Sequence, residues 1–337
     1  AIGGWIPPRP EASMQAVARW APIVQKLMIK ALFRYSLLVL AGLVVLLIVT
    51  VVVIYLLSES RLRRTYTINA AVDAPDAALI AHGQELARSR GCADCHGDDF
   101  GGKVIIDEMP FARIVGTNIS PKRGESDKRR VHERMYRALH HGIDMDSEPL
   151  LMMPSAEFTS LSAQEIEAIS AYLSSVPPVD RTLPESKLGL LGRTLLATGR
   201  LEGFLSAEKI DHTKPSVDIP PPLGTIAYGR HVAQICTGCH RADFGGGRMS
   251  HGGPKAPPAA NLTPHASGLA GWSESDFLAS MRTGRRPDGS EIDGRFMPWR
   301  AVGHASDQEL RSIWKFLRTL PPVGRDSREA DSVAPVP

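Results

Sequence analysis

A five-residue motif occurs twice in this chain and contains every cysteine that the chain has. The first copy, CADCH, spans residues 92–96, and the second, CTGCH, spans residues 236–240. Two thiols on one turn followed by a histidine form the pattern C-x-x-C-H, which attaches a haem of the c type. The thiols reach the two vinyl groups of the porphyrin, and the imidazole binds the iron. We therefore expect two covalent haem c groups, held by Cys92, Cys95 and His96 and by Cys236, Cys239 and His240.

Two other readings of C-x-x-C fit this chain less well. A thioredoxin-like dithiol and half of a zinc site both use a C-x-x-C pair, but neither requires the histidine that follows. The two pairs of a zinc site also usually lie some 15–20 residues apart, whereas here Cys95 and Cys236 are separated by more than a hundred residues. Haem attachment is the reading that explains both histidines.

A second iron ligand is predicted at matching positions of the two halves. Met153 follows His96 by 57 residues, Met297 follows His240 by 57 residues, and each methionine precedes a proline. The same offset of 144 residues relates the Phe-Gly-Gly at residues 100–102 to that at 244–246. Such matching indicates an internal duplication. It selects Met153 and Met297 as axial ligands from among methionines that are more often flexible core residues.

Histidines without a matching partner are expected to have no role in binding iron. His140 and His141 are the alternative ligands for the first iron, but the second half has Met281-Arg282 near that place. We therefore expect these two histidines at the surface. We also expect the remaining histidines to be exposed to solvent, among them His132, His212, His231, His251 and His304.

Each half ends in a clearly marked helix. Ser162 with Glu165, and Ser306 with Glu309, form the S-x-x-E capping box that begins a helix. Apolar residues follow both boxes at the spacing of one buried helix face, and a Pro-Pro pair ends each helix because proline cannot continue it. Helices are also predicted before each C-x-x-C-H, at 78–88 and 228–235. Loops rich in Gly and Pro are predicted at 101–121 and 245–264.

This order of elements resembles class I cytochrome c domains, here in tandem. The resemblance covers about 76–179 and 223–323, and it implies an all-α fold in which the haem supplies the centre of each domain. The Asn-x-Ser/Thr-Pro segments and the stretch 272–277 also resemble cytochrome subunits of periplasmic alcohol dehydrogenases. In that family a loop proline carbonyl orients the proximal histidine, a role that would fall on Pro110 and Pro254. The order of anchor and haem domains is similar to that of the diheme subunit of cbb-type oxidases.

Residues 35–57 contain no charged side chain. As a helix they would be roughly 35 Å long, enough to cross a hydrocarbon core of about 30 Å. We expect a retained transmembrane helix here, since a cleaved signal peptide has a shorter apolar region. The segment 1–34 before it is expected inside the cell or on the inner membrane surface. The fold class predicted is thus one N-terminal transmembrane helix followed by two tandem class I cytochrome c domains.

The haem domains are expected in the periplasm of a bacterium, because c-type attachment takes place in an exported compartment. The chain has a net charge of +3, but residues 1–66 hold eight Lys/Arg against two Asp/Glu, so the remainder is mildly acidic. The basic balance therefore gives no support to nucleic-acid binding. Residues 180–222 are predicted to be a linker with a short Leu-rich helix lying across the two domains, and residues 324–337 a disordered tail.

The predicted function is electron transfer and not catalysis. Histidine and methionine together saturate an iron, so no position is left for a substrate. We expect a membrane-tethered diheme carrier or subunit that passes electrons from a quinol-oxidising complex towards a terminal oxidase or reaction centre. Its partners would be these membrane complexes and possibly soluble cytochromes. The alternative is an electron-accepting subunit of a periplasmic dehydrogenase complex.

Overall fold

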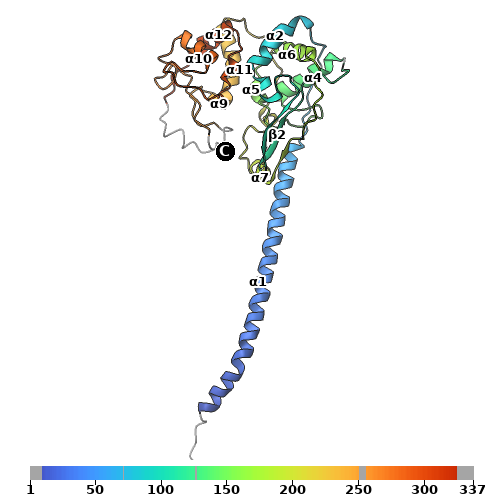
Figure 1. Ribbon diagram of the computed structural model, residues 1–337, viewed down its shortest axis with the longest axis vertical. Helices are drawn as coiled ribbons and strands as arrows, with labels where there is room; N and C mark the ends of the chain where they lie inside the picture. The colour runs from blue at the N-terminus through green and yellow to red at the C-terminus, as the bar shows by residue number, and fades with distance from the viewer. Residues whose placement is uncertain (1–9, 71, 126, 250–255, 325–337) are drawn as a thin grey trace, which may run out of the picture. The chain divides into compact units, whose positions relative to one another are not determined.

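The computed structural model describes residues 10–70, 72–125, 127–249 and 256–324 (Figure 1). Contacts within the chain divide it into two compact units, residues 1–57 and residues 58–337. The described part of the first unit is helical, and the second unit contains two helical domains and one small sheet. The chain is therefore predominantly helical, as the sequence predicts.

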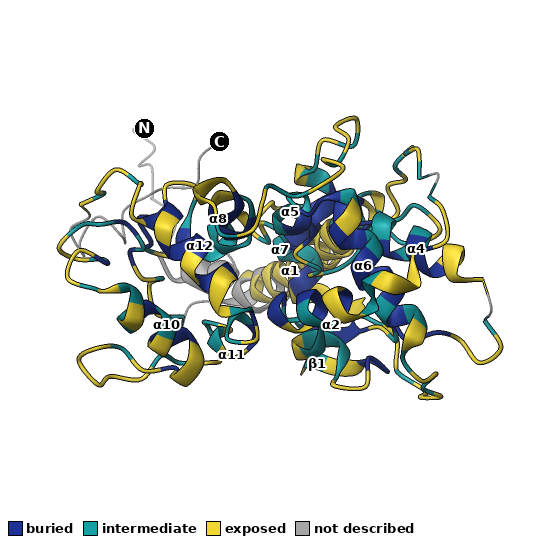
Figure 2. Ribbon diagram, turned by 90° about the horizontal axis from the view of Figure 1, so that it is seen from above, coloured by how far each residue is buried: buried dark blue, intermediate teal, exposed yellow. Residues whose placement is uncertain are grey.

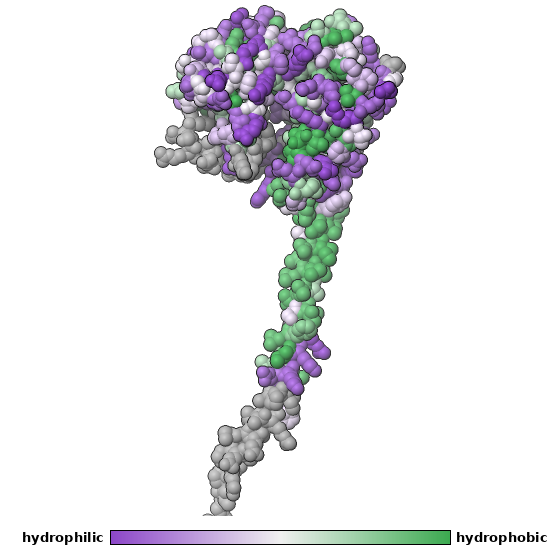
Figure 3. Space-filling model, viewed as in Figure 1, coloured by the Kyte–Doolittle hydropathy of each residue, from purple (hydrophilic) through white to green (hydrophobic). Residues whose placement is uncertain are grey.

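The first helix is much longer than the predicted span. α1 runs over Pro10–Leu62, and its part Gln25–Leu62 is long and apolar enough to cross a membrane. Among the described residues it is the only helix of this kind. Figure 3 shows the middle of this part of α1 as a mostly hydrophobic surface, with hydrophilic side chains towards its N-terminal end. The predicted span 35–57 lies inside α1, and residues 10–34 continue the same helix instead of forming a separate segment.

Three helices form the core of the first domain. They are α2 (Ile80–Ser89), α4 (Lys128–Tyr136) and α6 (Ala163–Ser175), with a short 3₁₀ turn η1 (Ala77–Leu79) before α2. α6 is the central helix, because it packs against both α2 and α4. The apolar positions that the sequence marks on α6 are fully or partly buried, and the fully buried ones join core residues of the other two helices: Leu86, Val131, Met135, Ile166, Ile169 and Leu173.

The second domain repeats this arrangement. α8 (Ile226–Ala233) and α10 (Glu274–Thr283) both pack against α12 (Asp307–Leu317). The buried face of α12 matches the predicted spacing, and its residues form one core with those of the partner helices: Val232, Phe277, Leu310, Ile313, Phe316 and Leu317. Figure 2 shows buried and exposed residues alternating around α6 and α12, as expected for helices with one face in a core.

A glycine allows the first and last helices of each domain to cross closely. A Cβ atom added at Gly83 of α2 would lie 1.8 Å from the carbonyl oxygen of Ala168 in α6. A Cβ added at Gly229 of α8 would lie 1.9 Å from the carbonyl oxygen of Ser312 in α12. Both crossings therefore depend on the missing side chain, which brings the two backbones into direct contact.

A small sheet beside the first domain departs from the predicted all-α fold. β1 (Lys103–Glu108) pairs antiparallel with β2 (Ala112–Gly116), and β2 pairs antiparallel with β3 (Lys187–Leu188). The sequence predicts a loop over 101–121, and this prediction was wrong for the residues that form the strands. Val104, Ile105 and Ile106 supply the β-branched residues that favour a strand.

The Leu-rich linker helix packs on this sheet and not across the two domains. α7 (Leu190–Ala197) buries Leu196 in a cluster with Ala112 and Ile114 of β2. Leu62, the last residue of α1, packs against the same cluster. Two ion pairs fix this end of α1 to the linker: Arg193 of α7 binds Glu59, and Arg61 binds Glu208 of the 3₁₀ turn η3 (Ser206–Lys209).

The two predicted capping boxes differ in the structure. At α6 the box is complete, because Ser162 accepts a hydrogen bond from Glu165 N and the Glu165 carboxylate accepts one from Ser162 N. At α12 only half is formed: Ser306 Oγ accepts from Glu309 N, but Ser306 N donates to Glu85 of the first domain at 3.0 Å. The Glu309 carboxylate is turned away because a cation of the first domain binds it.

Candidate haem-binding sites

Both C-x-x-C-H motifs lie on short helical turns. The first forms α3 (Cys92–His96), and the second begins in the 3₁₀ turn η4 (Gln234–Cys236) and ends in α9 (Thr237–His240). The residue after each histidine has a positive φ, +80° at Gly97 and +68° at Arg241. The chain therefore turns sharply away after each histidine in the same manner.

Each motif histidine is held by one backbone carbonyl. His96 Nδ1 lies 2.7 Å from the carbonyl oxygen of Thr117, and His240 Nδ1 lies 2.7 Å from that of Ala260. A carbonyl can only accept, so Nδ1 carries the proton and Nε2 presents its lone pair. Burial lowers the pKa of both histidines, although each carbonyl opposes this effect. Both rings are therefore neutral imidazoles with Nε2 available to a metal.

The carbonyl that orients His96 is not the predicted one. Pro110 follows a cis peptide bond, and its carbonyl accepts a hydrogen bond from Leu191 N of α7. The prediction for Pro110 was wrong because the chain enters the β1–β2 turn there, seven residues before Thr117. Pro254 lies outside the described residues, and the corresponding role in the second domain belongs to Ala260.

The loop after each motif has the same backbone in both domains. Gly102 N donates to the carbonyl of His96, and Gly246 N donates to the carbonyl of His240. Phe100 and Phe244 have φ values of 58° and 56°, and both residues are 3% exposed. The duplication seen in the sequence is thus a duplication of loop geometry around each histidine.

An asparagine beside each orienting carbonyl ties the loop to the end of its domain. Asn118 Nδ2 donates to the carbonyl of Val179, and Asn261 Nδ2 donates to that of Val323, both at 2.7 Å. The side-chain oxygens accept from Ser120 and Thr263. These hydrogen bonds explain why the Asn-x-Ser/Thr-Pro motif occurs at matching positions of the two halves.

The two Met-Pro turns also share one conformation. Pro154 has φ −79° and ψ 51°, and Pro298 has φ −76° and ψ 52°. Met153 is partly buried against the core of the first domain, and Met297 against that of the second. Met152, the neighbouring methionine, is 38% exposed. The two methionines at matching positions are therefore both partly buried, whereas the unmatched Met152 is exposed.

Polar atoms left without partners in the core fit a polar cofactor at both sites. The residues that follow the two Met-Pro pairs are Ser155 and Trp299, 144 positions apart. The Ser155 hydroxyl and the Trp299 indole N–H are both buried and have no hydrogen-bond partner among the described residues. A buried donor of this kind normally has a partner. Haem, with its two carboxylates, fits the chemistry of these positions.

Several histidines that were predicted to be exposed are buried instead. His140 and His141 are 4% and 3% exposed, and His132 is 8% exposed. His141 Nδ1 lies 3.2 Å from His212 Nδ1, and burial lowers the pKa of His141 to about 4. Among the described residues, no group of three or more His, Cys, Asp and Glu side chains is placed to hold a further metal ion.

Comparison with known proteins gives the family of this chain. The cytochrome c family model matches it twice, at residues 80–177 and 226–321. The chain belongs to the cytochrome c family. The two matches coincide with the two domains built around C-x-x-C-H, and they establish a diheme c-type cytochrome with two covalent haem c groups whose role is electron transfer.

Curated relatives are cytochrome subunits and a diheme cytochrome. The cytochrome c subunit of a quinone alcohol dehydrogenase from Gluconacetobacter polyoxogenes is 28% identical over 273 residues, which cover 74% of this chain and 57% of the relative. A gluconate 2-dehydrogenase cytochrome c subunit from Pantoea cypripedii is 26% identical, covering 74% of this chain and 61% of the relative. A diheme cytochrome c-type protein from Cereibacter sphaeroides is 22% identical, covering 72% and 86%. The chain thus spans little more than half the length of the dehydrogenase subunits.

Proposed function

We propose that this cytochrome is a membrane-tethered diheme subunit that accepts single electrons from a partner dehydrogenase and passes them onwards. In this proposal Cys92 and Cys95, and Cys236 and Cys239, hold the two haems covalently. His96 with Met153, and His240 with Met297, provide the axial ligands. When bound, the haem supplies a reversible one-electron couple, which a sulfur ligand shifts towards the reduced state.

One observation carries the ligand assignment. Both histidines have Nδ1 fixed at 2.7 Å from a carbonyl oxygen, so that only Nε2 remains for iron. This arrangement fixes the ring orientation and the tautomer, as the outer hydrogen bond of a metal-bound histidine generally does. The two Met-Pro turns then offer one soft sulfur to each domain, at the same distance along the chain. With both axial positions filled, the residues support electron exchange through the haem edge.

The proposed tether is α1. Its part Gln25–Leu62 has the length and composition of a membrane span, and the large apolar side chains from Leu27 to Leu57 are well exposed within the unit that contains them. A helix that is apolar on all sides suits a hydrocarbon environment. With the haem domains in the periplasm of a bacterium, the span would hold them at the inner membrane.

The names of the relatives favour a dehydrogenase as the electron donor. Two kinds of relative are cytochrome c subunits of dehydrogenases, one for alcohol and one for gluconate. The test is to purify the full chain from membranes in mild detergent and identify the proteins that accompany it. We expect a dehydrogenase with a quinone or flavin cofactor. Copurification of haem b with an iron-sulfur protein in its place would contradict the proposal.

A second candidate is a carrier between a quinol-oxidising complex and a terminal oxidase or reaction centre. The diheme cytochrome of Cereibacter sphaeroides favours it, because this chain covers 86% of that relative. The same purification separates the two candidates, since this carrier would accompany a bc-type complex or an oxidase.

A further inference from the structure

Buried side chains of the two domains form polar pairs where the domains meet. Glu165 and Glu309 occupy equivalent positions, 144 residues apart, at the starts of α6 and α12. Glu309 of the second domain binds Arg90 of the first, with Nη1 and Oε1 2.5 Å apart. Glu165 of the first domain binds His231 of the second, with Oε2 and Nε2 2.7 Å apart. Each carboxylate is therefore bound by a basic side chain of the other domain.

Arg90 is the central charge of this group. Its side chain is 5% exposed, and its Nη2 lies 4.0 Å from Glu165 Oε1. Burial lowers the pKa of Arg90, but Glu309 and Glu165 raise it by more, so the guanidinium stays charged. The equivalent position in the second domain is Gln234, which is exposed, so the molecule has this buried cation in one copy.

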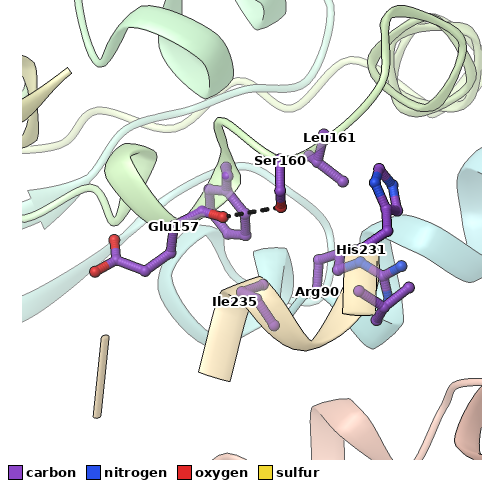
Figure 4. Close-up of a pocket in the computed structure, with 8 residues that line it drawn as sticks. Arg90, Glu157, Ser160, Leu161, His231 and Ile235 are labelled. Atoms are coloured by element: carbon purple, nitrogen blue, oxygen red, sulfur yellow. Dashed lines mark hydrogen bonds between the residues drawn. The ribbon is translucent and has the colours of Figure 1, made fainter. Parts of the chain in front are cut away.

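Arg90 lies beside both haem attachment points. In the chain it precedes Cys92 by two residues, and it shares a cavity of about 10 Å³ with His231 and with Ile235, the residue before Cys236 (Figure 4). The Arg90 charge acts on the side-chain positions of both Cys92 and Cys236. One fixed charge thus acts on both attachment sites.

We propose that Arg90 and Glu309 form an electrostatic control shared by both haems, in which the buried arginine favours the reduced state of each haem and the carboxylate limits this effect. The proposal rests on the function proposed above. A ferric haem carries one more positive charge than a ferrous haem, so a nearby cation raises the reduction potential and a nearby anion lowers it. Inside a protein such charges interact more strongly than in water.

Glu309→Gln tests the proposal most directly, because it removes one negative charge and leaves Arg90 charged. We expect both reduction potentials to rise. The equilibrium constant for reduction of each haem should increase at least about threefold, which is about 30 mV for a one-electron couple. The measurement is a redox titration of the full chain in detergent, followed by optical and paramagnetic resonance spectra that separate the two haems.

Two further variants separate charge from structure. Arg90→Lys keeps the charge but replaces the guanidinium whose Nη1 binds both Glu309 and Ser89, so we expect a lower unfolding temperature with both potentials unchanged. Arg88→Gln removes an exposed arginine from α2, two residues earlier, and should leave the potentials unchanged.

Three outcomes would overturn the inference: potentials that stay constant in Glu309→Gln, a shift in only one haem, or a shift in Arg90→Lys as large as that in Glu309→Gln. Haem content gives a separate check on the underlying function. If the chain carries two haems and their reduction potentials do not change on these substitutions, only the shared control by Arg90 and Glu309 is contradicted. If the chain carries one haem or none, the proposed function is contradicted.

Discussion

At the scale of single residues, the haem sites depend on atoms that a sequence shows only indirectly. The cysteines, histidines and methionines follow from the motif and its repeat, because side-chain chemistry and spacing select them. The orienting carbonyls of Thr117 and Ala260 do not, since every residue has a carbonyl and only the folded loop decides which one reaches the ring. The signal that could have located them is the asparagine that follows each, at matched positions of the two halves.

Replacing the proposed sulfur ligands one at a time tests the assignment of the axial positions. Met153→Ala should remove about half of the near-infrared band of an iron bound to methionine in the oxidised protein, and Met297→Ala should remove the other half, because each domain contributes one such iron. The potential of the affected haem should fall. Met152→Ala is the control, since this neighbour is exposed, and it should leave the band intact. A band that survives both ligand replacements would show the assignment to be wrong.

The buried histidines predict a pH dependence of stability. The pKa of His141 is lowered to about 4, first by burial and then by the charges of neighbouring groups. In the unfolded chain this histidine takes up a proton near pH 6.5, whereas in the folded chain it stays neutral until about pH 4. The free energy of unfolding should therefore fall as the pH is lowered from about 6.5 to about 4. Below about pH 4 this histidine should cause no further decrease.

Between pH 6.5 and 4, His141→Gln should reduce the slope of the free energy of unfolding against pH by the amount that corresponds to one bound proton. Denaturant unfolding at several pH values measures the slope. The matched control is His82→Gln, a substitution at an exposed histidine of α2, and it should change the slope less. Equal slopes in the wild type and in His141→Gln would rule out this histidine as the source.

At the scale of secondary-structure elements, the helices were predictable and the sheet was not. The buried faces of α6 and α12 follow from apolar spacing, and their starts follow from Ser162 and Ser306. The strands β1 and β2 were missed because glycine and proline around them are also typical of loops. The incomplete box at α12 could not be foreseen, since the group that replaces Glu309 at Ser306 N belongs to another domain.

The helix crossings predict a strict requirement for glycine. Gly83→Ala or Gly229→Ala should lower the free energy of unfolding by about 1–3 kcal/mol, because a methyl group cannot fit against the carbonyl of the crossing helix. The measurement is the thermal unfolding of the full chain. Gly271→Ala is the matched control, because a Cβ there would meet nothing within 4 Å. Crossing-site variants as stable as this control would show that the helices can move apart at no cost.

At the scale of the whole molecule, the order of the transmembrane helix and the two haem domains could be predicted from the sequence, but the contacts that join them could not. The duplication and the apolar span are periodic or compositional, and such signals can be read along the chain. Arg61 with Glu208 and Arg193 with Glu59 are separated by more than a hundred residues, and no spacing rule connects them. The same holds for Arg90 with Glu309.

The pair of Arg61 and Glu208 should protect the segment that follows α1. The two side chains make two hydrogen bonds, and both are partly buried. Arg61→Gln should therefore increase the rate of proteolysis over residues 62–70, and Glu208→Gln should do the same. The double variant should resemble Arg61→Gln, because that change already removes the interaction with Glu208 together with the hydrogen bond from Arg61 to the Leu196 carbonyl. Arg200→Gln, at an exposed arginine just after α7, should leave the rate unchanged. Fully additive effects would contradict the pairing.

The exchange of carboxylates between the domains has an evolutionary consequence. In the duplicated chain, the glutamate at the start of the last helix of each domain pairs with a residue of the other domain: Glu165 with His231, and Glu309 with Arg90. Neither copy can now be lost without leaving a buried carboxylate, Glu165 or Glu309, without its partner in the other domain. The repeats still look interchangeable in sequence, but selection must now act on them as one inherited pair.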